Sequence, residues 1–332
     1  MRLIESNVEI IKEDNPLKKI ELAGRTCYKS ESNITDDSAI RFVKNLIKNN
    51  HTAMLEHATF VFELINPSYD YDFSHYIPTK NPILCEINKF LNTTNITINS
   101  VSLKEQIITK KNRVLVSGNL RAINESGIEI LLYALYNYNP ALVYNEEFNL
   151  TFKPSTAEEV KKDCRIVNLN DYSGLTEKEY KAHTYTTMRF TCDRGVTHEL
   201  VRHRLFSFAQ ESTRYCNYSK EKFGNGDLTF IKPANYDEWN ESNKSIFTNY
   251  LETVENTYKS MSSNGLKPDN TRAILPNALK TEIVVTGNEE EWEHFFDLRS
   301  RGTTGKPNPD MKKVADMALE LYYKKKIRRS KL

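Results

Sequence analysis

After His183 the hydrophobic pattern of this chain has the period of a strand, and from Val196 it has the period of a helix. This change of period restricts the folds that the chain can adopt. The segment TYTTMRFTCDRG alternates apolar and polar residues as a half-buried strand does, and it ends at a glycine, where a turn is expected. The segment VTHELVRHRLFSF follows, and it predicts a helix that begins at Val196 with Thr197 as its cap. A strand followed closely by a helix predicts a domain in which the two share a core.

The rest of the chain repeats this mixture of periods. Apolar residues at helical spacing predict a helix over residues 37–49, with Asp36 or Asp37 as its N-cap, whereas residues 58–64 alternate like a strand. Further helices are expected over residues 128–138 and 245–260, from near Arg272, from near Glu289 and over 309–326, and a short strand over 148–152. Helices that alternate with strands favour a mixed α/β or α+β fold.

The composition excludes several classes of protein. The formal net charge of +2 is too small for nucleic-acid or membrane binding through bulk electrostatics, so any anion site must be local. No apolar run is long enough to span a membrane, and the first residues lack the apolar core of a signal peptide. The five cysteines are scattered without a C-x-x-C pair, which argues against a disulfide framework or a structural zinc site. We therefore expect a cytoplasmic protein.

The residues around Arg202 have the chemistry of an anion site. Arg202, His203 and Arg204 bring up to three positive charges to one end of the predicted helix, and the N–H fork of arginine suits phosphate and carboxylate groups. Residues 210–214 then supply an amide, a carboxylate, two hydroxyls and another guanidinium. Such a loop can hold a phosphate and read the polar edge of a base. An R-H-R tripeptide without these neighbours would be interpreted as the solvated end of a basic helix.

The full string RHRLFSFAQESTRY, residues 202–215, resembles the signature of the flavin-dependent thymidylate synthases. That signature is R-H-R, seven further residues, a serine, and an arginine two positions beyond it, which correspond here to Ser212 and Arg214. Within the spacer, Ser207 and Glu211 also resemble family residues.

Two blocks near the N-terminus extend the resemblance. Residues 23–30, AGRTCYKS, are similar to the family's Ala-x-Arg-x-Cys-Tyr segment. HTAMLEHATFVFEL is similar to the flavin-contacting block H-x-[ST]-x-x-E-H-x-x-F-x-F and supplies His51, Glu56 and His57, with Ala53 where Ser or Thr is usual. A His-Glu-His cluster can also bind a metal. We interpret it instead as a helix-to-strand turn whose histidines are hydrogen-bonded within the fold, and we expect no metal site.

The C-terminal third contains further similar blocks. In TRAILPNALKTEIVVTGN, Arg272 lies four residues before a proline and resembles the nucleotide-binding arginine of the family's R-x-x-L-P block. Asn288 and His294 fall where the family has flavin-contacting residues, and Arg299 matches the arginine that faces the uracil ring. Two departures accompany these matches, because Glu290 stands where some members carry an arginine and KPNPDM resembles the family's H-A-Q-[PW]-E-[IL] segment without its histidine.

The resemblance implies reductive methylation of dUMP to dTMP. In the family, 5,10-methylenetetrahydrofolate supplies the carbon, NADPH reduces FAD, and the reduced FAD provides the hydride, without a cysteine nucleophile. Cys216, close to the signature, is accordingly interpreted as a packing residue. The family is a homotetramer with its flavin sites between subunits, so the expected partners are dUMP, the folate, NADPH and other copies of this chain.

The resemblance also assigns roles to individual residues. Arg299 and Ser212 are the expected catalytic residues, with Arg299 polarising the uracil and Ser212 acting as a binding group, since no His–carboxylate relay is evident beside it. The residues expected to bind dUMP are Glu199, Arg202, Gln210, Glu211, Ser212, Thr213, Arg214, Arg272 and Arg299. The residues expected to bind FAD are His51, Glu56, Arg202, His203, Arg204, Leu205, Asn288 and His294.

The resemblance covers roughly residues 20–64 and 183–325. It implies one α+β (mixed α/β) domain over residues 1–332, with an antiparallel-rich sheet packed with helices. Residues from about 66 to 181 carry weak periodic signals and many Asn, Ser and Tyr, and we interpret them as a family-variable insertion rather than a second domain.

Three other interpretations remain open. A nucleic-acid-binding protein could use R-H-R and the basic tail 324–331, although the near-neutral charge and the mixed signs of the signature argue against it. A different flavoprotein or folate enzyme could keep the architecture, but no G-x-G-x-x-G follows a predicted strand, so a Rossmann site is unsupported. An inactive homologue is suggested by Ala53, Glu290 and the missing histidine.

Overall fold

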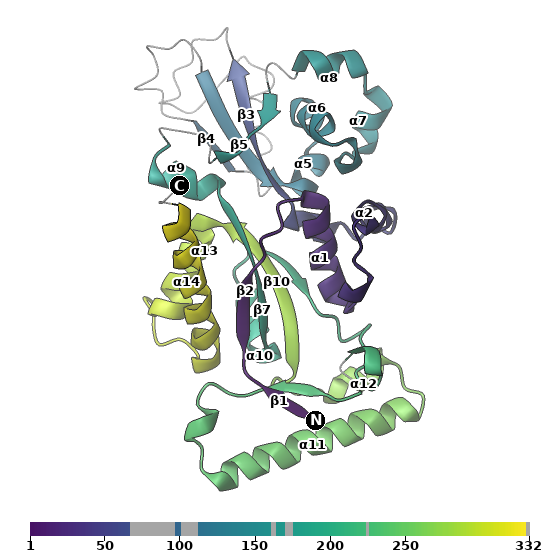
Figure 1. Cartoon of the computed structure of the whole chain (residues 1–332), viewed down its shortest axis with the longest axis vertical. Coiled ribbons are helices and arrows are strands. Elements are labelled where there is room, and N and C mark those ends of the chain that lie inside the picture. The colour runs from purple at the N-terminus through teal and green to yellow at the C-terminus, as the bar shows by residue number, and fades with distance from the viewer. Residues whose placement is uncertain (67–96, 101–111, 161–163, 170–174, 224–225, 330–332) are drawn as a thin grey trace.

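The computed structural model describes residues 1–66, 97–100, 112–160, 164–169, 175–223 and 226–329. Its strands form three sheets that follow one another along the long axis of the molecule (Figure 1). In their order within each sheet, the strands are β4 (Thr97–Ser100), β5 (Asn112–Asn119), β3 (Thr59–Asn66) and β6 (Cys164–Ile166) at one end; β2 (Asn7–Ile10), β7 (Tyr185–Asp193), β10 (Lys280–Asn288) and β8 (Ser207–Gln210) in the middle; and the pair β1 (Arg2–Ile4) and β9 (Thr229–Ile231).

Both four-stranded sheets are antiparallel throughout, whereas β1 and β9 pair in parallel. The helices are α1 (Pro16–Tyr28), α2 (Ser38–Lys48), α5 (Leu120–Ser126), α6 (Glu129–Tyr138), α7 (Glu146–Thr151), α8 (Pro154–Val160), α9 (Glu177–His183), α10 (Arg194–Leu200), α11 (Glu241–Ser263), α12 (Pro268–Thr271), α13 (Glu289–Phe296) and α14 (Pro309–Arg329). The expected mixed fold with an antiparallel-rich sheet packed with helices is therefore confirmed. Among the described residues, no helix combines the length and apolarity needed to cross a membrane.

The middle sheet is covered by helices on both faces. α13 and α14 lie on one side of it and α1 on the other (Figure 1). Ile283 and Val285 of β10 point into the core on the α13–α14 side, while Val284 packs with Ala23 and Cys27 of α1 on the opposite side. Because both faces of β10 are buried in its middle, three consecutive residues there, Ile283, Val284 and Val285, are apolar instead of alternating with polar ones.

The helix expected from near Arg272 is wrong. α12 ends at Thr271, a single 3-10 turn covers Arg272–Ile274, and β10 follows after a short loop. Pro276 explains why no helix continues past Ile274, because a proline disfavours helical geometry at the residue before it, and Leu275 is extended with ψ of 125°.

The helix expected from Val196 through Phe208 is also wrong in both its start and its extent. α10 begins at Arg194 and is capped by Asp193, whose carboxylate accepts a hydrogen bond from the N–H of Val196 at 2.9 Å. The helix stops at Leu200, so R-H-R lies in the turn that follows. Residues 207–210 form β8 instead, because hydrogen bonds to β10 outweigh the local helical period.

The described part of the expected insertion packs against the N-terminal blocks. Leu17, Val43 and Phe62 share one hydrophobic core with Leu131 and Leu135 of α6. The rest of this segment, residues 67–96, 101–111, 161–163 and 170–174, lies outside the described residues.

The strand expected over residues 148–152 is wrong, because α7 covers most of it. The side chain of Asn145 caps this helix, and the ring of Phe148 packs edge-on against Tyr133 at 4.9 Å between ring centroids. The expected helices α2, α6, α11, α13 and α14 and the expected strands β3 and β7 are confirmed. Asp37 occupies the N-cap position of α2, but its side chain makes no capping hydrogen bond.

Gly287 of β10 is required by the close approach of an aromatic ring. A Cβ at this position would lie 2.1 Å from Cδ1 of Phe206. That ring cannot move freely, because Phe206 is buried and packs against Trp292 at 4.5 Å between centroids. We expect Gly287→Ala to lower the free energy of unfolding by about 1–3 kcal/mol, as overpacked cores do, measured by urea titration.

Adding Phe206→Leu to Gly287→Ala tests that cause. The smaller side chain removes the clash. The double variant should therefore lose less free energy of unfolding than the two single variants lose together. Strict additivity would contradict the assignment of the loss to Phe206.

Candidate active site

The turn at residues 201–206 separates exposed from buried side chains. Arg202, Arg204 and Leu205 are exposed, and Leu205 retains 66% of its accessible surface. His203 is buried, and its backbone N–H donates to the carbonyl of Leu200 at 3.1 Å. The turn therefore presents two guanidinium groups and two apolar side chains, those of Val201 and Leu205, outward, while its histidine ring is buried in the protein.

Arg299 joins this turn to the C-terminal part of the chain. Its Nη1 donates to Oε2 of Glu199 at 2.9 Å, and its Nε donates to Nε2 of His203 at 3.2 Å. Arg299 lies in the π-helical turn Asp297–Arg301 that extends α13, and such turns are frequent at functional sites. The structure thus brings together three of the predicted site residues, with Glu199 and His203 separated from Arg299 by about a hundred positions in sequence.

The contact with Arg299 fixes the proton on His203. An arginine Nε–H can only donate, so Nε2 of His203 must accept and the ring proton of the neutral histidine resides on Nδ1. That nitrogen faces Oε1 of Glu291 at 3.8 Å, and the ring of His294 lies 6.0 Å from the ring of His203. His294 itself is exposed.

The residues after β8 form a loop tied to two other segments. The backbone N–H of Ser212 donates to the carbonyl of Cys27 at the end of α1, at 2.9 Å. The guanidinium of Arg214 is exposed and pairs with Asp269 of α12 at 3.0 Å. Arg272, also exposed, follows α12 in the next turn. The contact with Asp269 therefore places the Arg214 side chain next to α12, which is directly followed by Arg272, another arginine predicted to bind the nucleotide.

Two further predicted residues of this loop make their contacts inside the fold. Gln210 donates through Nε2 to the hydroxyls of Thr197 at 3.0 Å and Thr281 at 3.3 Å. Thr213 is buried. The exposed polar groups of the loop are therefore chiefly those of Ser212, which is half-buried, and Arg214.

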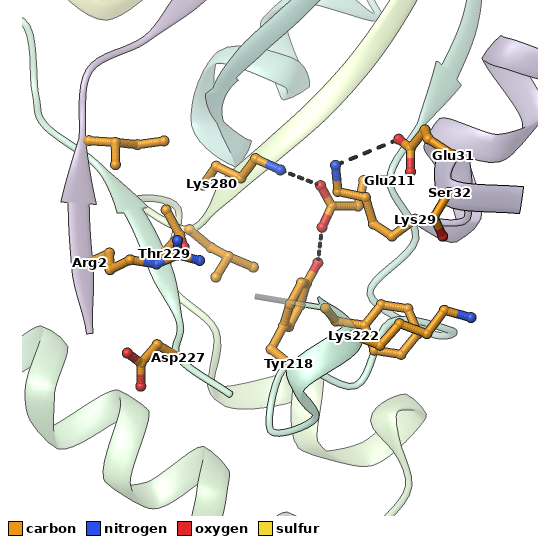
Figure 2. A pocket seen from close by; sticks show the side chains of 13 residues that line it. Arg2, Lys29, Glu31, Ser32, Glu211, Tyr218, Lys222, Asp227, Thr229 and Lys280 are labelled. Carbon is orange, nitrogen blue, oxygen red and sulfur yellow. Dashed lines mark hydrogen bonds and ion pairs between the residues drawn. The ribbon is translucent and has the colours of Figure 1, made fainter. Parts of the chain in front are cut away.

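Glu211 lies behind the loop, at a pocket of about 430 Å³ (Figure 2). Its Oε1 accepts from the hydroxyl of Tyr218 at 2.9 Å and its Oε2 from Nζ of Lys280 at 3.0 Å. The neighbouring carboxylate, Glu282, is shared by Lys280 and Lys29, each at 2.6 Å. Burial alone would raise the pKa of Glu282, but the two ammonium groups lower it to about 2. Lys280 and Glu282 are therefore both charged despite their burial.

The predicted flavin block near the N-terminus is a 3-10 turn, Thr52–His57, that leads into β3. His51 is exposed, with its Nδ1 3.4 Å from the hydroxyl of Tyr28, and Glu56 pairs with Arg121 at 3.0 Å. His57 is fully buried, and its Nδ1 lies 2.9 Å from the hydroxyl of Thr286 on β10.

Asn288 has a structural contact of its own. It ends β10, and its side-chain oxygen caps α13 by accepting from the N–H of Glu291 at 2.9 Å. This cap fixes where α13 starts and hence where the following turn places Arg299. The amide nitrogen of Asn288 remains the group that can donate to a ligand.

Several residues that shape the site were missed from the sequence: Lys29, Tyr218, Asp269, Lys280, Glu282, Thr286 and Glu291. A signal for two of them was present. Lys280 and Glu282 stand two positions apart, and on a strand that spacing places both side chains on one face. The signal was lost because the segment was not predicted as a strand.

The family model described as thymidylate synthase complementing protein matches residues 9–69 and 169–325. The chain belongs to this family. The matched ranges contain the R-H-R turn, Arg299, the loop after β8 and the turn before β3, while residues 70–168 fall outside them.

Curated relatives carry the name flavin-dependent thymidylate synthase. The protein of Pyrococcus abyssi is 34% identical over 150 residues, which are 43% of this chain and 57% of that protein. The protein of Clostridium tetani is 26% identical over 194 residues, 52% of this chain and 74% of that protein. The protein of Pyrococcus furiosus is matched over 46% of its length, so this chain spans about half the length of several relatives that it matches.

Among solved structures, a UMP/dUMP methylase, PolB from Streptomyces cacaoi, covers 59% of this chain and 84% of its own length at 18% identity. The TM-score is 0.37, which is too low to support an argument about fold or function.

Two buried histidines predict how this family member responds to acid. Burial lowers the pKa of His57 to about 3 and that of His183 to about 4, whereas the ordinary value is 6.5. Below that ordinary value the unfolded chain binds more protons than the folded one. The free energy of unfolding should therefore fall as the pH drops from about 7 to about 5, by up to about 1.4 kcal/mol per pH unit for each histidine.

Urea titrations across this pH range measure the effect, and His57→Gln is the variant that isolates one histidine. The variant will be less stable at every pH, but its stability should depend less steeply on pH than that of the parent. Equal slopes would show that His57 does not take up a proton on unfolding.

Proposed function

We propose that this chain is a flavin-dependent thymidylate synthase that methylates dUMP to dTMP. The observation that supports this most is the contact of Arg299 with Glu199 and His203, because it unites the R-H-R turn with the arginine expected at the uracil. Membership of the family and the names of the curated relatives point to the same reaction. We propose 5,10-methylenetetrahydrofolate as the carbon donor and NADPH as the reductant.

In this proposal the chain binds dUMP from two sides. Ser212 and Arg214 hold the phosphate, with Arg272 assisting, since guanidinium groups and hydroxyls are suited to phosphate oxygens. Arg299 donates to the carbonyl edge of the uracil and stabilises negative charge as it develops on the ring. Glu199 and His203 hold the guanidinium in place, which limits the reorganisation needed during the reaction.

The remaining nucleotide contacts follow from where these groups lie. Glu199 is half-buried next to Arg299, so the carboxylate can orient the sugar or base that Arg299 engages. Arg202 is exposed on the adjoining turn and borders both ligands. Gln210 and Thr213 are engaged or buried within the fold, so their part is to shape the loop that holds the nucleotide.

The residues proposed for FAD fit such a ligand. Exposed Arg202 and Arg204 offer donors for its pyrophosphate, and exposed Leu205 offers apolar surface for its rings. His51 and His294 are exposed and Asn288 keeps an amide donor, so these side chains can reach a ligand. Glu56 lies in the turn that follows His51 and would act indirectly, by its position in that turn. FAD, when bound and reduced by NADPH, would supply the hydride that the methylation requires.

Cys216 is poorly suited to nucleophilic attack on the uracil. Its side chain is fully buried, and burial raises the pKa of the thiol to about 12. A thiol with such a pKa is protonated at neutral pH, and the thiolate is the nucleophilic form. This supports a mechanism without an enzyme cysteine nucleophile and the packing role expected for Cys216.

We further propose a cytoplasmic homotetramer whose sites lie between subunits. Leu205 retains 66%, Tyr215 58% and Val201 40% of their accessible surfaces, and all three flank the signature. Large apolar side chains exposed beside a site are what a subunit interface covers. Within each subunit, residues 1–332 form one domain in which the 66–181 segment is an insertion, which is supported by the core that α6 shares with α2 and β3.

The decisive test is dTMP formation by the FAD-loaded protein from dUMP, methylenetetrahydrofolate and NADPH. We expect the parent to be active and Arg299→Ala to lose about 10²–10³-fold in kcat, as expected when a donor to developing charge is removed. Ser212→Ala should chiefly raise the KM for dUMP. A parent that binds FAD but forms no dTMP would leave an FAD-binding homologue without synthase activity.

Arg301→Ala is the matched control for Arg299→Ala. Arg301 lies in the same π-helical turn, but its guanidinium pairs with Asp297, Glu293 and the hydroxyl of Tyr323. We expect it to keep parental activity. Equal losses in the two variants would show that the turn has been disturbed, and full activity of Arg299→Ala would remove Arg299 from the mechanism.

The ion pair between Arg214 and Asp269 predicts that removing the Asp269 charge will increase the affinity for dUMP. Asp269 competes with the substrate phosphate for the guanidinium, and both side chains are more than half exposed, so the pair is weak. Asp269→Asn should therefore lower the KM for dUMP by no more than about fivefold, with kcat unchanged. A raised KM would show that Asp269 orients Arg214 instead of competing for it.

A further inference from the structure

We propose that Glu211 is a positioning residue. Its buried carboxylate holds in place the loop that carries Ser212 and Arg214, and it does not itself contact the nucleotide. Lys280 and Tyr218 act with it. This inference rests on the proposed function, because it names how the dUMP-binding loop is held.

The first support is that the Glu211 carboxylate is already engaged by the protein. Its side chain is 1% exposed. It accepts from Tyr218 and Lys280, and Oε2 also accepts from the backbone N–H of Glu282 at 3.2 Å. A carboxylate has about four acceptor positions, and three are taken. Figure 2 shows the side chain of Glu211 between those of Lys280 and Tyr218.

The second support is that these contacts fix the backbone next to the binding groups. The N–H of Glu211 donates to the carbonyl of Glu282 at 2.8 Å, and the N–H of Ser212 donates to the carbonyl of Cys27 at 2.9 Å. The start of the loop is thereby held by β10 on one side and by the end of α1 on the other. A shift of Glu211 must therefore move Ser212, which is the next residue.

The third support is that the cluster joins both of those anchoring segments. Lys280 bridges Glu211 and Glu282, and Lys29, the C-cap residue that follows α1, also pairs with Glu282. Lys29 adopts a left-handed backbone with φ of 47°, which is uncommon for a residue other than glycine and persists where surrounding contacts hold it. The same charges thus connect α1, β10 and the loop.

The buried charges of this cluster balance, and so do its two more exposed ion-pair partners, Glu31 next to Lys29 and Arg189 next to Glu282. Glu211 and Glu282 carry two negative charges, and Lys29 and Lys280 carry two positive ones. All four side chains are at most one-fifth exposed. Removing one charge leaves the cluster with one unit of uncompensated buried charge, which favours a new arrangement of the side chains that remain. Removing one charge of each sign restores the balance, and this difference provides the test.

The experiment compares Glu211→Gln, Lys280→Gln and the double variant in the FAD-loaded enzyme. Each single variant should raise the KM for dUMP about tenfold or more, with kcat within about threefold of the parent, because the binding groups are displaced while Arg299 is not. The double variant should recover at least half of that loss on a logarithmic scale. Equilibrium binding of dUMP should follow the same order.

Direct contact with the nucleotide predicts a different pattern. If Glu211 itself binds dUMP, Lys280→Gln leaves KM near the parental value and the double variant binds no better than Glu211→Gln. Either result overturns the positioning role. A parent without dTMP formation would instead overturn the proposed function, so the two failures are distinguishable.

Two further variants control for stability. Glu63→Gln removes another fully buried carboxylate, whose partner Arg165 lies 2.6 Å away, in the sheet that contains β3 and β6. This variant should lower the melting temperature without changing the KM for dUMP. Tyr218→Phe removes only the hydrogen bond behind Glu211, and it should raise KM in a fold that tolerates the change. Unchanged KM in Tyr218→Phe and in both single glutamine variants would overturn the inference.

Discussion

The pairing of β10 with β7 and β8 positions most of the candidate site. One end of β10 carries Lys280 and Glu282, which hold the loop after β8, and the other end carries Asn288, which caps the helix leading to Arg299. Between them, Thr286 contacts the buried His57 of the flavin block. A single strand, buried on both faces, therefore fixes three segments that are far apart in the sequence.

Burial on both faces also explains why β10 tolerates charge at only one end. Its middle residues, from Ile283 to Val285, are fully buried and apolar, whereas Lys280 lines the pocket and Glu282 pairs with it. There, ammonium and carboxylate groups compensate each other, and the low pKa of Glu282 reflects this. Buried pairs of this kind add little net stability compared with apolar packing. Their persistence here is better explained by the geometry that they impose.

The sequence predicted those elements whose signals are local. α2, α14 and β7 were found because a helix or strand period runs through each of them. β8 and β10 were missed because their pairing is non-local, and because residues 196–208 have a helical period that β10 overrides by hydrogen-bonding to Ser207–Gln210. The same limit applies to the site. The signature predicted which residues belong to it, but not that Glu211 would face inward toward Lys280, since that depends on the register of β10.

The candidate site combines exposed side chains with buried side chains that hold the backbone in place. Exposed Arg202, Arg204 and Arg214 alternate along the chain with buried His203 and Glu211. Exposed groups can reach ligands, but long side chains alone would sample many positions, and ordering them at binding would weaken affinity. The buried neighbours reduce that loss, because each is hydrogen-bonded to a distant element, His203 to Arg299 and Glu211 to Lys280. The mixed-sign signature is therefore suited to a preorganised site, because its arginines are exposed while His203 and Glu211 are held inside the fold.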